Sequence, residues 1–153
     1  MTLLHKTAGV VILLIALILV GHTIIEPLYY ESTKTAPYSS IWETIDIIVS
    51  GSLFLCLIYS TYFNVSLRPS ASLKHWITAK CWLYGTLFSI VLFLWGWFSV
   101  LTEKFIPAQG ASGYLLWIFF DAFYPIISGS LSIHILLNAN DIKHSMEQDN
   151  IDE

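Results

Sequence analysis

The sequence predicts an all-α integral membrane protein, a four-helix up-down-up-down transmembrane bundle. Two observations support this. The 153-residue chain is 56% hydrophobic and only 12% charged, with a mean hydropathy of +0.67, whereas a soluble domain carries about twice that charged fraction. Four apolar stretches, each long enough to cross a bilayer as a helix, alternate with polar segments. We therefore expect a single transmembrane domain at residues 1–140, followed by an acidic, polar tail at 141–153.

The first span is predicted at about residues 8–25, after the basic residue Lys6. A secretory signal also has a basic start and an apolar core. However, Leu19 and Gly21 match a small-x-small cleavage site poorly, so we expect a retained helix. The following segment, 26–41, is polar, aromatic and long for a helix connection, and such loops either cover a bundle end or meet partners.

The other three spans are predicted at about residues 42–63, 75–102 and 114–137. Glu43 and Asp46 lie in the first turns of the second span. The third span is rich in tryptophan, as is common where rings lie at bilayer interfaces. The fourth span contains Asp121 and Pro125.

Lysine and arginine positions predict the orientation. With four spans, the chain ends and the middle turn share one side, which holds Lys6, Arg68, Lys74, Lys80 and Lys143. The other side holds only Lys34 and Lys104. The positive-inside rule then places both termini in the cytoplasm, in the cell (inner) membrane.

The second and fourth spans share a short motif. Residues 47–53, IIVSGSL, resemble residues 125–131, PIISGSL, and each copy follows a Trp-x-x-x-Asp step. A tandem duplication of a two-helix hairpin would explain this, as would convergent membrane composition. Small residues let helices approach closely in lipid, so we expect packing roles for Ser50, Gly51, Ser52, Ser128, Gly129 and Ser130.

Asp121 is the strongest candidate for a polar intramembrane site. An ionisable group at membrane depth needs a partner, a proton or water. It would act in ion or proton handling together with Asp46, Glu43 and His22, or serve as a structural acid held by its neighbours. For Glu43 and Asp46 a simpler interpretation is the favourable position of carboxylates at a helix start.

Metal and haem are weaker hypotheses. His22, Glu43, Asp46 and Asp121 form a mixed nitrogen and oxygen set that would suit zinc, manganese or iron, but no His-x-x-x-His or Glu-x-x-His spacing supports it. A bis-histidine haem would use His75 and His134. The positions of these residues support neither a metal site nor a haem site. Cys56 and Cys81 are expected to be inert thiols. We therefore predict no cofactor.

The leading functional prediction is a non-catalytic accessory or assembly subunit of a membrane complex, because no catalytic constellation is recognisable. Its partners would be the bilayer and other membrane-protein subunits or a second copy of itself, and no basic patch indicates nucleic acid. The first alternative is a small transporter or proton- or cation-handling protein, working as a homo-oligomer through the intramembrane aspartates. The second is a haem- or metal-binding redox protein.

Overall fold

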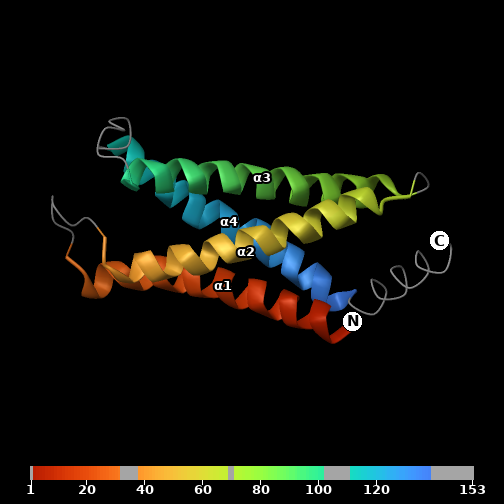
Figure 1. The fold of residues 1–153 in the computed structure, drawn as a ribbon, viewed down its shortest axis with the longest axis horizontal. Helices are drawn as coiled ribbons and strands as arrows, with labels where there is room; N and C mark the ends of the chain where they lie inside the picture. The colour runs from red at the N-terminus through yellow and green to blue at the C-terminus, as the bar shows by residue number, and fades with distance from the viewer. Residues whose placement is uncertain (1, 32–37, 69–70, 102–110, 139–153) are drawn as a thin grey trace.

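The computed structural model describes residues 2–31, 38–68, 71–101 and 111–138. In these ranges the chain forms four α-helices: α1 (Thr2–Tyr29), α2 (Ile41–Val65), α3 (Leu73–Leu101) and α4 (Ala111–Leu137) (Figure 1). Each helix is long and apolar enough to cross a membrane. The prediction of an all-helical chain with four helices able to span a membrane is therefore confirmed, while the predicted tail at 141–153 lies outside the described residues.

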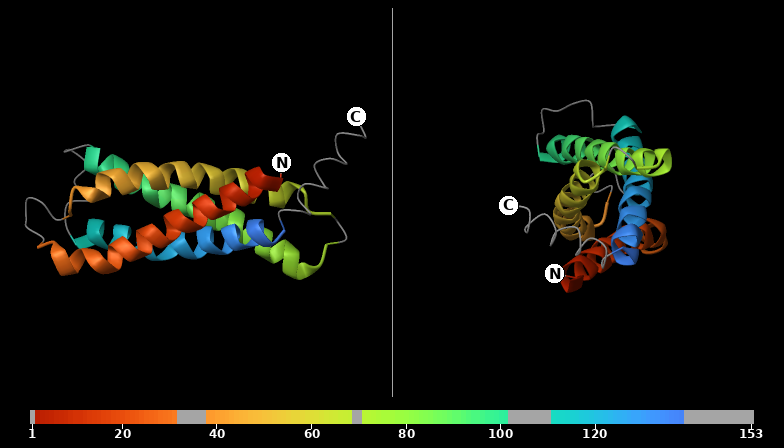
Figure 2. Two further views of the ribbon diagram at one scale, coloured as in Figure 1. Left: turned by 90° about the horizontal axis from the view of Figure 1, so that it is seen from below. Right: turned by 90° about the vertical axis from the view of Figure 1, so that its right-hand side faces the viewer.

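The helices form a ring around a narrow core. α1 packs against α2 and α4, and α3 packs against the same two helices, so α1 and α3 lie diagonally opposite each other (Figure 2). The start of α1, the turn between α2 and α3, and the end of α4 lie at one end of the bundle (Figure 1). We call this the turn end. The end of α1 and the start of α2 lie at the opposite end.

The helices extend beyond most of the predicted spans, and α1 differs most. The loop expected from Glu26 begins only after Tyr29, because α1 continues through Pro27 in its last turn. A proline there removes a single intrahelical bond, since its ring nitrogen cannot donate to the carbonyl of Thr23. This extension adds Glu26 to the helical part of the molecule.

The core is apolar, with hydroxyl groups distributed along it. Phe120, Tyr124 and Leu131 of α4 are almost completely buried. Ser89, Ser128 and Ser132 are also buried. Each donates a hydrogen bond to a carbonyl of its own helix. Such bonds satisfy hydroxyl groups without water, so small polar residues can lie between helices in lipid.

Glycines bring two helix pairs, α1 with α4 and α3 with α4, close together at three positions. A Cβ atom added at Gly9 would lie 2.9 Å from Leu136, one at Gly85 would lie 2.7 Å from Ile127, and one at Gly96 would lie 2.6 Å from Trp117. These distances are shorter than real side-chain contacts. The absence of a side chain at these positions therefore sets how closely α4 packs against α1 and α3.

Candidate intramembrane acidic site

Glu26 joins the end of α1 to the start of α2. Its Oε1 accepts a hydrogen bond from the backbone N–H of Ser39 at 2.9 Å, and its Oε2 accepts one from Nε1 of Trp42 at 2.7 Å. The His22 ring lies one turn earlier, with its centre 4.6 Å from that of Trp42. Glu26 was not among the predicted site residues, because the sequence predicted a loop at 26–41. The signal for it was the spacing of four between His22 and Glu26, which places both on one helix face.

Asp121 lies deep in α4. It follows Ala111 by ten residues, which corresponds to about 15 Å along the helix. Asp46 of α2 and Glu26 of α1 are near enough for their charges to act on Asp121. Three helices therefore bring carboxylates to the same half of the bundle.

One oxygen of Asp121 is left without a partner. Its Oδ1 is buried and has no hydrogen bond within the described ranges, and Nε2 of His22 is in the same state. Buried polar atoms in proteins are almost always paired. Buried atoms of His5, Asn64 and Thr86 share this state, and Asp121 is the acidic residue among them.

Asp121 also lines a groove between α1 and α4. The groove has a volume of about 480 Å³ and is otherwise almost wholly apolar, with Leu17, Ile118, Pro125 and Gly129 among its lining residues. It opens on the outer surface of the bundle, where lipid would lie. An ionisable group beside such an apolar groove is costly unless something pairs with it.

Two prolines each remove a helical hydrogen bond near this groove. Pro125 cannot donate the usual bond to the carbonyl of Asp121, and Pro27 cannot donate it to the carbonyl of Thr23. Thr23 and Asp121 both line the groove. Each of these two carbonyls therefore lacks its usual helical donor.

A buried polar group lies one turn from Asp121, at the centre of the bundle. Tyr124 of α4 donates a hydrogen bond of 2.6 Å from its hydroxyl to Oγ of Ser52 on α2. This bond joins α4 to α2 across the core. Cys56, one turn after Ser52, is also buried in the core, whereas Cys81 is exposed.

The residues expected to pack helices have different surroundings. Ser52 and Ser128 are buried, whereas Ser130 is exposed and accepts a hydrogen bond from Nε1 of Trp82. Ser50 bonds to the carbonyl of Ile47. A Cβ atom at Gly51 or Gly129 would meet nothing within 4 Å, so these two glycines open onto the outside of the bundle.

The structure does not bring together the mixed site of His22, Glu43, Asp46 and Asp121. Glu43 is exposed on α2, and within the described ranges no group of three or more histidine, cysteine or acidic side chains could hold a metal ion. The metal hypothesis gains no support from this arrangement.

The histidines near the turn end, including His75 and His134 that a haem would use, each have a neighbour in the protein. His134 packs against the rings of Phe63 and Trp82, with centres 4.9 and 4.6 Å away. His75 is exposed and its Nδ1 lies 2.8 Å from Oγ of Ser72. Nδ1 of the buried His5 lies 2.9 Å from the hydroxyl of Tyr59.

Fold and composition together define a small multi-pass membrane protein. No protein-family model matches the chain, and neither the curated proteins nor the solved structures that were compared with it include a match.

Proposed function

We propose that this protein is a non-catalytic accessory subunit of a membrane complex, and that a helix of a larger partner docks in the groove between α1 and α4. In this proposal the chain crosses the cell (inner) membrane up-down-up-down with both termini in the cytoplasm. The observation that carries it is the buried, partnerless Oδ1 of Asp121 beside an apolar groove.

The chemistry of the groove specifies the partner. Asp121 and the carbonyls left without their usual donors by Pro125 and Pro27 are acceptors, so the docked helix should present a donor such as serine, asparagine or arginine. Ala122 and Gly129 are small, which favours close approach of a second helix in lipid. An apolar helix with one donor at the depth of Asp121 fits both features.

Photo-crosslinking in native membranes tests this docking. A benzophenone amino acid replaces Ile126 at the groove, and the matched control replaces Ile58 on the outer face of α2. These isoleucines are 68% and 62% exposed. We expect one discrete protein adduct from position 126 and none from position 58. Asp121→Leu should abolish the adduct, whereas Asp121→Asn should retain it, because its amide oxygen still accepts a hydrogen bond.

Two outcomes would contradict the accessory proposal. The first is an adduct that persists in Asp121→Leu, or that forms equally from both positions. The second is an adduct with twice the mass of this chain, which would identify a homo-oligomer and support the alternative below.

The alternative is proton or cation handling by a homo-oligomer. It is favoured by the carboxylates of Glu26, Asp46 and Asp121, which come from three helices and interact electrostatically. The hydroxyl pair of Tyr124 and Ser52 continues the polar groups toward the bundle centre. An Asp121→Asn variant that assembles normally but loses proton uptake in reconstituted vesicles would favour this function. Duplication of a hairpin stays a prediction in either case.

A further inference from the structure

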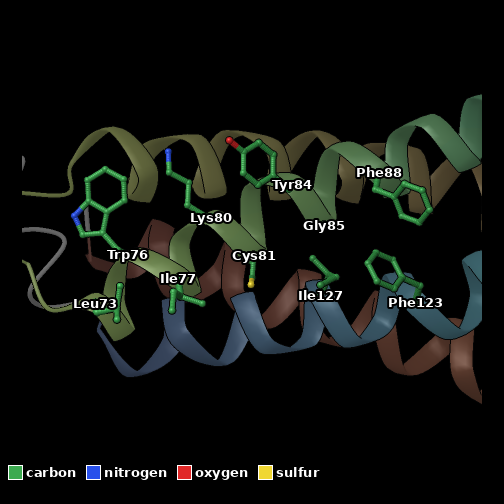
Figure 3. Close-up of a pocket in the computed structure, with 10 residues that line it drawn as sticks. All are labelled: Leu73, Trp76, Ile77, Lys80, Cys81, Tyr84, Gly85, Phe88, Phe123 and Ile127. Carbon is green, nitrogen blue, oxygen red and sulfur yellow. The ribbon is translucent and has the colours of Figure 1, made fainter.

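A second groove runs along the outside of α3 and α4 (Figure 3). Its volume is about 690 Å³ and its walls are almost wholly apolar. It extends from Leu73 to Phe88, sixteen residues that span about 22 Å of helix. At the far end the rings of Phe88 and Phe123 meet edge to face, with centres 5.4 Å apart.

A lysine lies near the turn end of this groove. Lys80 is half-buried, and its Nζ donates a hydrogen bond of 2.9 Å to Oδ1 of Asn64 and lies 5.1 Å from the centre of the Trp76 ring. A lysine ammonium has three donors, and these contacts leave donors for an anion. In the described part of the chain no carboxylate pairs with Lys80.

The surroundings of Lys80 are basic. The sequence contains no aspartate or glutamate between Asp46 and Glu103. Arg68 and Lys74 are both exposed near the turn between α2 and α3. Lysine and arginine near the membrane surface attract anionic headgroups, so the chemistry of this end of the groove favours an anion.

We propose that this groove binds an anionic phospholipid, with an acyl chain along α3 between Leu73 and Phe88 and the headgroup phosphate at Lys80. One leaflet of a bilayer with a core of about 30 Å gives an acyl chain about 15 Å of depth. The groove is longer than this depth, so it can hold the acyl chain and reach the headgroup interface. Trp76 is of the type that lies at headgroup level. Basic pockets between membrane helices bind anionic headgroups in this way.

Other occupants fit less well. A neutral lipid would fill the apolar walls but leave Lys80 without an anion. The acidic tail, 141–153, has no continuous apolar run that would match the walls. The proposal does not depend on the docking groove between α1 and α4, because the two grooves share no lining residue.

Quenching of tryptophan fluorescence by brominated lipids tests the proposal on the full chain in phosphatidylcholine vesicles. The contribution of Trp76 is the difference between the unmodified protein and Trp76→Phe. We expect brominated phosphatidylglycerol to compete for this site about fivefold better than brominated phosphatidylcholine, because one lysine near the membrane surface confers a preference of about this size.

Variants test which residues cause the preference for phosphatidylglycerol over phosphatidylcholine. Lys80→Gln should reduce this preference to near equality, and Lys80→Arg should retain it. Lys6→Gln is the matched control: it removes an exposed lysine of α1 at the same end of the bundle and should change nothing. Cys81→Phe should also lower the preference, because it places a ring in the groove. Equal quenching by the two lipids, or an unchanged preference in both Lys80→Gln and Cys81→Phe, would overturn the proposal.

Discussion

At the scale of single residues, the half of the bundle away from the turn end is organised around Glu26. Its carboxylate accepts two hydrogen bonds, one from the backbone at Ser39 and one from the Trp42 indole. A carboxylate can accept both because it has only acceptor oxygens. This one side chain therefore fixes the position of the first turn of α2 relative to α1.

Glu26→Gln should destabilise the bundle by about 1–3 kcal/mol, because glutamine keeps one acceptor and turns an amide toward the second donor. Glu43→Gln is the matched control, since Glu43 is exposed, and should have almost no effect. Thermal unfolding in mild detergent, followed by circular dichroism, measures both. Equal unfolding temperatures for the two variants would show that the Glu26 bonds do not stabilise the fold.

At the scale of helices, the spacing of α3 from α4 depends on Gly96. The nearest atoms to an added Cβ belong to the ring of Trp117. That ring also packs against Phe93 and Phe120, with centres 6.2 and 6.1 Å away. A ring held in this way has little room to move, whereas the Ile127 side chain facing Gly85 ends in flexible atoms.

Gly96→Ala should therefore lower the unfolding temperature in detergent, by overpacking that costs about 1–3 kcal/mol. Gly85→Ala should cost less. Gly51→Ala is the control, because an added Cβ meets nothing within 4 Å and alanine favours a helix more than glycine by about 1 kcal/mol. A Gly96→Ala variant as stable as Gly51→Ala would show that the contact with Trp117 can relax.

The sequence was sufficient to predict the four helices, since length and hydropathy determine membrane spans. It was not sufficient to predict which glycines lie against neighbouring helices. Gly51 and Gly129 lie in matching motifs, yet both open outward, while Gly9, Gly85 and Gly96 face neighbouring helices. Rotation of each helix about its axis decides this, and it follows from packing against the other helices rather than from local pattern. Asp121 was recognisable from its depth in the fourth span. Glu26 could be recognised only when the end of α1 was known.

At the scale of the whole molecule, the proposed topology can be tested by thiol labelling. In a Cys81→Ala chain, a membrane-impermeant maleimide added to intact cells should label Glu31→Cys but not Ser66→Cys. Inverted vesicles should show the reverse. Both positions are exposed and lie outside the helices, and the excess of lysine and arginine at the turn end motivates the expected sides. Labelling of both positions from one side would contradict the topology.

The separation of acidic and basic residues along the described part of the bundle has an electrical consequence. Glu26, Asp46 and Asp121 belong to one half, and Arg68, Lys74 and Lys80 lie toward the turn end. In the proposed topology, the charges of these six residues form a dipole across the membrane. Moving one elementary charge through a potential of 100 mV changes the free energy by about 2.3 kcal/mol. In an energised membrane that is negative inside, the voltage itself would hold the turn end inward, and depolarisation would weaken that hold.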